Sequence, residues 1–283
     1  MITSVLLAAA LLGPSVPASK PARIVAVGGS VTEIVYALGQ EARLVARDTT
    51  STFPPAAEKL PDVGYMRQLS PEGVISVNPD LILALEGSGP PEALSVLSEA
   101  GIPFVNVPGT PYDRQGLKSK ILAVGKALGE EAAAESLAKK TDQAIEKAIA
   151  ERPKAKAPKR VMFVLSTRGG RILAAGRETA AAGIIDLAGG KNVFDFSGYK
   201  PVTDEALLTA DPEVIVRMSR PGLDTPHAES DDEIFSNPAV QQTTAGKARA
   251  LVRVDGLMAL GFGPRTAEAV ADLARRMYAP AAP

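Results

Sequence analysis

A segment of this chain recurs within it, 133 residues further on. Residues 70–83 align without a gap on residues 203–216. Each copy reads as an N-cap hydroxyl, an acidic residue, a short helix, an Asx-Pro turn and a buried strand. With a slip of one residue, Gly64-Tyr65 before the first copy matches Gly198-Tyr199 before the second. A chain built this way is constrained to two similar halves, each containing helices and strands.

Short apolar runs alternate with helical patterns in both halves. Strands are predicted at 24–27, 81–85, 103–107 and 161–165, and helices at 92–100 and 267–278. Ser30 and Glu33 have the spacing of a capping box, which predicts a helix that ends at Gly39. Buried strands separated by helices indicate parallel sheets. We therefore predict an α/β fold of two Rossmann-like lobes, with a ligand cleft between them at the carboxyl ends of the strands.

A change of amino-acid composition along the chain indicates the domain organisation. The segments 117–127 and 130–150 are rich in Ala, Lys, Glu and Leu, and a charged linker with two prolines follows at 152–158. This pattern predicts one long interdomain helix. The expected division is a signal peptide at 1–18, an N-terminal lobe at 19–128, the interdomain helix and linker at 129–157, and a C-terminal lobe at 158–283.

The first 18 residues resemble an export signal. The apolar run 5–12 is too short for a membrane span and precedes Val16-Pro17-Ala18, a small-residue cleavage pattern. No Lys or Arg precedes the run, and a buried N-terminal helix is the alternative. The chain has no cysteine to carry a lipid anchor. We expect cleavage near Ala18 and a free periplasmic protein.

Composition excludes several kinds of site. Without cysteine there is no disulfide, thiol nucleophile or Cys-ligated metal, and the single histidine, His227, cannot supply a multi-histidine metal site. His227 lies in a polar loop, where a solvated side chain is the ordinary interpretation. The chain has 31 basic and 32 acidic residues, so no basic footprint for nucleic acid is present.

Tyr65 is the clearest candidate for a residue that binds a ligand or a metal ion. It lies in a loop-like stretch close to Arg67, whose guanidinium would favour the phenolate, a known ligand of haem iron. A rim tyrosine that makes an ordinary hydrogen bond is the alternative. Glu72 and Glu205 occupy matched places in the repeat, where they complement helix dipoles or, alternatively, flank the mouth of the cleft as two acidic contact points.

Five segments, at residues 64–73, 198–201, 218–220, 255–257 and 261–266, carry a resemblance to a known family. They resemble the haem-binding periplasmic proteins of bacterial haem-uptake ABC transporters, and the resemblance covers about residues 23–278. Parts of it are shared with siderophore and cobalamin binders. It implies that haem b is the transported cargo, that the protein is a monomeric carrier and not an enzyme, and that its partner is an ABC permease dimer with its ATPase.

The resemblance also implies roles for individual residues. Tyr65 matches the axial ligand of the haem iron, Arg67 a neighbouring basic residue, and Arg220 a second-lobe arginine that hydrogen-bonds the tyrosine. The remaining positions are the cleft-lining Met66, Tyr199, Lys200 and Phe262, and the permease-docking residues Glu72 and Glu205. Some members place a histidine opposite the tyrosine, where this chain has Ser166-Thr167-Arg168. We therefore expect no histidine on the iron, and stacked binding of two haems is not favoured; Arg168 is a candidate propionate contact.

Three alternatives remain open from the sequence. Two of them are a carrier of a ferric siderophore and a carrier of cobalamin, which are the cargoes of other members of the class. An enzyme on the same scaffold is the less favoured alternative, because no nucleophile–histidine pair or paired-carboxylate motif is present.

Overall fold

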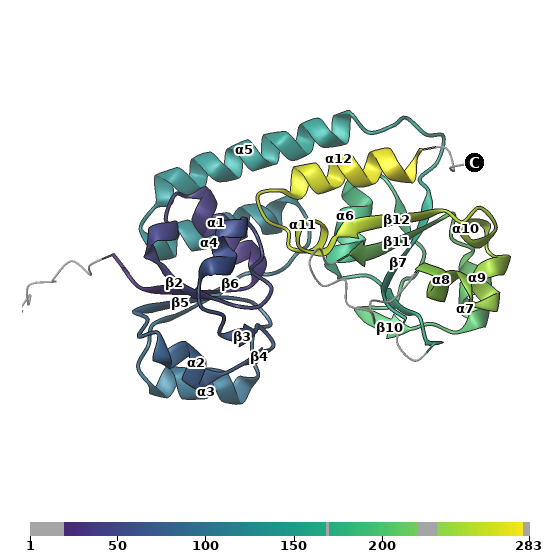
Figure 1. The fold of residues 1–283 in the computed structure, drawn as a ribbon. Coiled ribbons are helices and arrows are strands. Elements are labelled where there is room, and N and C mark those ends of the chain that lie inside the picture. The colour runs from purple at the N-terminus through teal and green to yellow at the C-terminus, as the bar shows by residue number, and fades with distance from the viewer. Residues whose placement is uncertain (1–19, 168–169, 220–230, 280–283) are drawn as a thin grey trace, which may run out of the picture.

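The computed structural model describes residues 20–167, 170–219 and 231–279, which form two lobes joined along one side by helices (Figure 1). The N-terminal lobe contains a parallel four-stranded sheet of order β2-β1-β5-β6. Its strands are β1 (Ile24–Val27), β2 (Leu44–Arg47), β5 (Leu81–Leu85) and β6 (Phe104–Val107). The predicted strands at 24–27 and 81–85 are confirmed residue for residue.

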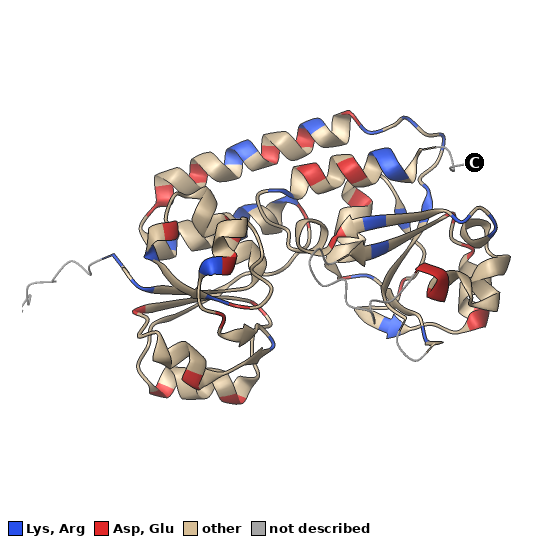
Figure 2. Cartoon of the chain, viewed as in Figure 1, with Lys and Arg blue, Asp and Glu red and all other residues tan. Residues whose placement is uncertain are grey.

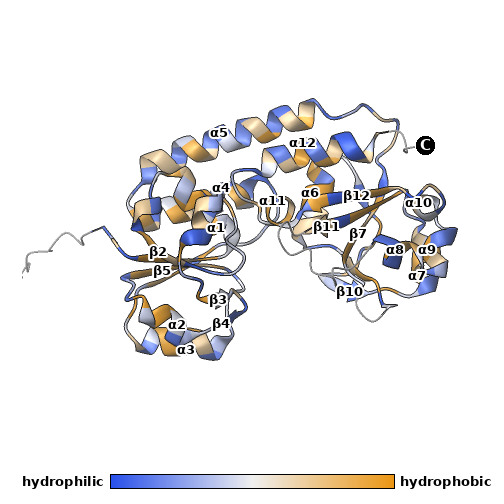
Figure 3. Cartoon of the chain, in the orientation of Figure 1, coloured by the Kyte–Doolittle hydropathy of each residue, from blue (hydrophilic) through white to orange (hydrophobic). Residues whose placement is uncertain are grey.

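Both faces of this sheet are covered by helices (Figure 1). In β1, Ile24 and Ala26 pack into one apolar cluster while Val25 and Val27 pack into another, which is why the strand is a continuous apolar run. Strands β5 and β7 are likewise largely hydrophobic in Figure 3. The surrounding elements are α1 (Gly29–Ala37), α2 (Pro71–Ser76), α3 (Pro91–Glu99), α4 (Arg114–Leu128) and the 3-10 turns at Glu41–Arg43 and Pro55–Lys59.

The long helix α5 (Glu131–Ala150) packs on α4 and on α12 (Thr266–Met277) of the C-terminal lobe. Its 20 residues span about 30 Å, enough to lie across both lobes. One apolar cluster contains Ile121 of α4, Ile145 of α5, Ile184 of α6 (Ala180–Leu187) and Leu273 of α12. The two lobes therefore share a hydrophobic core on this side.

The C-terminal sheet is mixed. Strands β7 (Arg160–Ser166), β9 (Lys191–Asn192), β11 (Val214–Ser219) and β12 (Leu251–Asp255) pair in parallel, while β8 (Leu173–Ala175) and β10 (Tyr199–Pro201) are antiparallel additions. The sequence prediction of parallel strands omitted this pair, which needs no crossover helix because antiparallel strands accept short connections. The remaining helices are α7 (Asp204–Ala210), α8 (Asp231–Phe235), α9 (Pro238–Gln242), α10 (Thr244–Lys247) and α11 (Gly256–Leu260).

The structure confirms the internal repeat. Ser70 caps α2 and Thr203 caps α7, each hydroxyl accepting a hydrogen bond of 3.2 Å from the backbone N–H three residues on. The turn residues Asn78 and Asp211, 133 positions apart, both have positive φ, 46° and 38°. The strands that follow, β5 and β11, each lie between two parallel neighbours. The two copies therefore adopt the same local conformation.

The predicted capping box at Ser30 is wrong. Helix α1 has Gly28 as its N-cap, and no side chain caps it. Ser30 is 1% exposed, and the Glu33 carboxylate, 4% exposed, instead accepts hydrogen bonds from Arg265 of the C-terminal lobe. A contact between the lobes overrides the local pattern.

Candidate functional site

Tyr65 lies on a short hairpin of the N-terminal lobe, formed by β3 (Gly64–Tyr65) and β4 (Gln68–Leu69). Met66 and Leu69 are buried in the core of that lobe and anchor the hairpin. Tyr65 is 40% exposed, and Arg67 at the turn is also exposed. Gly64 has a φ of 97°, which only glycine adopts without strain. The hairpin thus presents a phenol and a guanidinium on a fixed support.

Met66 does not fit the predicted cleft-lining role. Its side chain is 8% exposed and packs with Val63 and Val74 beneath the hairpin. Alternation along the hairpin puts Met66 on the inner face while Tyr65 points outward. Met66 therefore supports the hairpin and offers little surface to a ligand.

The C-terminal lobe contributes Tyr199 and Lys200 from β10. Burial raises the pKa of Tyr199, while hydrogen bonds from Ala181 and Thr179 and the charge of Arg67 act in the opposite direction. Lys200 is exposed, with its Nζ 5.6 Å from the centre of the Phe196 ring. The charge of Arg67, in the N-terminal lobe, thus affects the pKa of Tyr199, in the C-terminal lobe.

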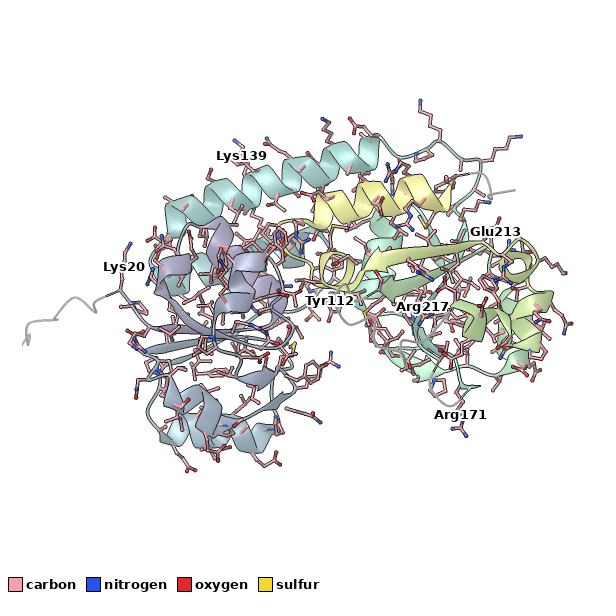
Figure 4. All side chains as sticks on the ribbon, viewed as in Figure 1. Lys20, Tyr112, Lys139, Arg171, Glu213 and Arg217 are labelled. Atoms are coloured by element: carbon pink, nitrogen blue, oxygen red, sulfur yellow. The ribbon has the colours of Figure 1, made fainter. Side chains whose placement is uncertain are left out.

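Tyr112 is a further aromatic residue at this place, one that the sequence patterns did not reveal. It lies between the lobes in the connection before α4 (Figure 4). Burial raises the pKa of Tyr112, Arg67 lowers it, and Glu86 raises it. Arg67 therefore acts on both Tyr112 and Tyr199. The signal available in the sequence was an aromatic residue in a polar turn, Pro111-Tyr112-Asp113, in a chain with only 4% aromatic residues.

Phe262 is not exposed between the lobes as the resemblance implied. Its ring is 2% exposed and meets Tyr112 edge-on, with centroids 5.5 Å apart and an interplanar angle of 61°. Its backbone has a φ of 48° and its carbonyl accepts a hydrogen bond from Lys120. Phe262 is therefore a packing residue beneath Tyr112, and haem cannot contact its ring in this arrangement.

Two buried charged contacts connect the lobes beneath these aromatic residues. Lys120 Nζ lies 3.0 Å from the carbonyl oxygens of both Gly261 and Phe262 and 3.4 Å from Ser30 Oγ. Burial lowers the pKa of Lys120 to about 8, although the charge of Glu33 acts against this shift. All three ammonium hydrogens have an acceptor, so the lysine ties α4 to the second lobe.

The second charged contact is the ion pair between Glu33 and Arg265, with Glu33 Oε2 3.1 Å from the Arg265 guanidinium. Burial raises the pKa of Glu33, and the hydrogen bonds and charge of Arg265 partly offset that effect. The guanidinium also lies 3.6 Å from the centre of the Phe53 ring. These contacts hold the first turns of α1 against the segment before α12.

The predicted docking residues Glu72 and Glu205 lie in the first turns of α2 and α7, where both are exposed. Ser70 Oγ donates to Glu72 Oε2 over 3.2 Å. Acidic residues are visible on both helices in Figure 2. The predicted positions Arg168, Arg220 and His227, and the predicted signal peptide, lie outside the described residues.

Two cavities lie away from Tyr65. One of about 630 Å³ is beside α7 and is lined in part by Phe194 and Glu205, and one of about 370 Å³ is between the end of α5 and Tyr278. Within residues 20–167, 170–219 and 231–279, no cluster of three or more His, Asp or Glu side chains is arranged to bind a metal ion. In the same ranges, every helix is too short or too polar to cross a bilayer.

The fold is similar to those of solved haem-binding proteins. The haem-binding protein BhuT, solved with two haems, is 38% identical with a TM-score of 0.83 over 90% of this chain and 97% of its own. RhuT from Roseiflexus sp. RS-1 is 34% identical, with a TM-score of 0.84 over 90% and 97%. A periplasmic haem-binding protein from Pseudomonas aeruginosa is 35% identical, with a TM-score of 0.82 over 93% and 95%.

The chain is also similar in sequence to substrate-binding proteins of ABC transporters. The Bacillus subtilis protein YvrC, called an ABC transporter substrate-binding lipoprotein, is 31% identical over 92% of this chain and 81% of its own. A vitamin B12-binding protein of Yersinia pestis is 29% identical over 71% of each. The periplasmic binding protein family model matches residues 24–256. The chain thus belongs to the periplasmic binding protein family, whose members bind substrates for ABC transporters and are not enzymes.

Proposed function

We propose that this protein is a periplasmic haem carrier that binds ferric haem through the Tyr65 phenolate and delivers it to an ABC permease. The observation that carries the proposal is the exposure of Tyr65 on a hairpin whose neighbours Met66 and Leu69 are buried. An exposed aromatic ring on an anchored turn gains little from packing, so packing does not account for a tyrosine at this position. The haem-binding neighbours at 34–38% identity support haem as the cargo.

The roles of the surrounding residues follow from their chemistry. A phenolate is a hard anionic donor suited to Fe(III). Arg67 and Lys200, both exposed, are suitable partners for the two propionates. Tyr199 and Tyr112 supply aromatic surface. Arg220 is proposed as the second-lobe arginine that hydrogen-bonds Tyr65.

The carrier's partners and location complete the proposal. As a monomer, it would dock on the two permease subunits through Glu72 and Glu205, one from each lobe. It would be exported by the signal at residues 1–18 and would diffuse freely in the periplasm, since no cysteine is present for lipidation. The shared core between the lobes and the Lys120 contacts favour small movements of one lobe against the other on loading.

Hemin titration tests the cargo and its ligand. We expect a Soret band of a tyrosinate-ligated ferric haem, lost or strongly shifted in Tyr65→Phe and preserved in the control Tyr36→Phe, which changes a tyrosine of α1 packed on the core. The chain has Ser166-Thr167-Arg168 where some members of the family place a histidine, so we expect no Tyr/His spectrum. The titration end point gives the stoichiometry, which is of interest because BhuT was solved with two haems.

Cobalamin is the second candidate, favoured by the vitamin B12-binding relatives. A corrin has amide side chains in place of two carboxylates, so Arg67 and Lys200 would lose their anionic partners. Titration with cyanocobalamin beside hemin separates the two. Tight binding of cyanocobalamin with no hemin spectrum would replace the haem assignment.

A further inference from the structure

Large apolar side chains are exposed at four places in the described part of the chain. They are Tyr65, Ile75, Val96 and Leu208, with exposed fractions of 40%, 37%, 45% and 42%. Tyr65 is the proposed iron ligand. Ile75 on α2 and Leu208 on α7 are 133 positions apart, so they occupy the same place in the internal repeat.

Packing does not explain these two side chains. In each helix the preceding residue, Val74 in α2 and Leu207 in α7, is the buried one, at 0% and 1% exposure. One buried aliphatic residue thus attaches each short helix to its lobe. Ile75 and Leu208 are second aliphatic residues that face solvent in both copies, although isolated exposed aliphatic residues are common in general.

Each exposed aliphatic residue follows a glutamate by three positions. Residues three apart in a helix are neighbours on one face, so Glu72 lies beside Ile75 and Glu205 beside Leu208. All four side chains are exposed. The two helices lie on the sides of their lobes that face away from α5 and α12 (Figure 1). We call Glu72 with Ile75 and Glu205 with Leu208 the two carboxylate–aliphatic pairs.

We infer that the carboxylate–aliphatic pairs are the two contact points for a two-fold symmetric permease, each received by a cationic residue beside an apolar pocket. A repeated surface on one chain matches a partner that presents the same site twice. The carboxylate steers association through charge complementarity, and the aliphatic side chain excludes water from the ion pair and holds the complex together. This inference rests on the proposed function, since it takes the ABC permease as partner.

Because the carboxylate and the aliphatic side chain have different roles, replacing each should change a different rate constant. Replacing a carboxylate changes the association rate and its salt dependence, because long-range steering is screened by salt. Replacing the aliphatic side chain leaves the association rate and its salt dependence nearly unchanged. It raises the dissociation rate by about tenfold for each contact point. Removing both aliphatic residues multiplies the two effects, because the sites lie on different lobes.

The experiment measures binding of the haem-loaded full chain to its permease–ATPase complex in lipid nanodiscs at several salt concentrations. The variants are Ile75→Ser, Leu208→Ser and the double change, with Glu72→Gln and Glu205→Gln for comparison. Val96→Ser is the matched control, since Val96 is an exposed aliphatic residue on α3 outside the aligned repeat. We expect faster dissociation only for Ile75→Ser and Leu208→Ser, with hemin affinity unchanged in every variant.

Two results would overturn the inference. One is wild-type dissociation by the Ile75→Ser, Leu208→Ser double variant, and the other is an equal loss in Val96→Ser. Failure of the proposed cargo gives a different pattern, because hemin would then not bind to the unmodified protein, whereas the permease measurements on the cargo-free chain would keep the same ranking of variants.

Discussion

Replacing Lys120 by methionine is expected to change how the stability of the protein depends on pH. Lys120 is 2% exposed, and burial lowers its pKa from 10.5 to about 8. Below pH 8 the lysine is charged in both the folded and the unfolded state, so the folded state bears the full cost of burying the charge. As the pH rises from 8 to 10.5, the folded protein loses this proton before the unfolded chain does, and stability increases.

The size of the effect follows from the two pKa values. Each pKa unit corresponds to about 1.4 kcal/mol, so this lysine makes the protein more stable at pH 10 than at pH 7 by about 2–3 kcal/mol. Methionine fills a similar volume without a titratable group. The loss of hydrogen bonds to Gly261 and Phe262 adds a constant offset that is independent of pH.

Urea unfolding of both proteins at pH 7, 8, 9 and 10 measures the difference. The free energy of unfolding of the wild type minus that of Lys120→Met should rise by about 2–3 kcal/mol over this range. Other titrating groups cancel because both proteins contain them. A difference that stays constant from pH 7 to pH 10 would instead mean that Lys120 keeps its ordinary pKa in the folded protein.

Two further changes test the contacts between the lobes. In Gly183→Ala, the new Cβ would lie 2.2 Å from the Tyr112 carbonyl oxygen, so we expect a loss of about 1–3 kcal/mol in urea unfolding; wild-type stability would contradict the close approach. Glu33→Gln leaves the Arg265 guanidinium, 17% exposed, without its charged partner and should cost about 3 kcal/mol, whereas the exposed control Glu151→Gln should cost under about 0.5 kcal/mol. Equal effects of the two glutamine variants would show that the buried pair is no stronger than a surface one.

Local patterns predicted the parts of the fold that depend on neighbouring residues. The buried strands at 24–27 and 81–85, the long helix near 130–150 and the caps at Ser70 and Thr203 were all predictable, because burial periodicity and N-capping act over a few residues. The repeat made the two-lobed architecture predictable as well, since two copies of one strand–helix unit form two similar sheets.

Contacts between distant segments were not predictable in this way. Glu33 lies three residues after Ser30, as in a capping box, but pairs with Arg265 at a separation of 232 residues. The sequence of α4 gives no sign that Lys120 is buried, because its acceptors are backbone carbonyls more than 140 residues away. Such pairings depend on how the lobes pack, which neither spacing nor composition encodes.

The candidate site was predictable in part. The motif around Tyr65 singled out a stretch that the sequence predicted only as a loop, and the structure shows it to be a short hairpin with Tyr65 exposed. The family resemblance assigned Met66 and Phe262 to the cleft, but both are buried. Their apolar side chains stabilise the segments that carry Tyr65 and Tyr112. Tyr112 was missed because it belongs to no motif and joins the site only through the packing of the two lobes.

The proposed function depends above all on the binding of haem iron by Tyr65. The most direct measurement is hemin titration of the wild type and Tyr65→Phe, followed by absorption and electron paramagnetic resonance spectra of the ferric complex. We expect a tyrosinate-ligated haem in the wild type and loss of that signature in Tyr65→Phe. An unchanged ferric spectrum in Tyr65→Phe, or a histidine-ligated spectrum in the wild type, would contradict it.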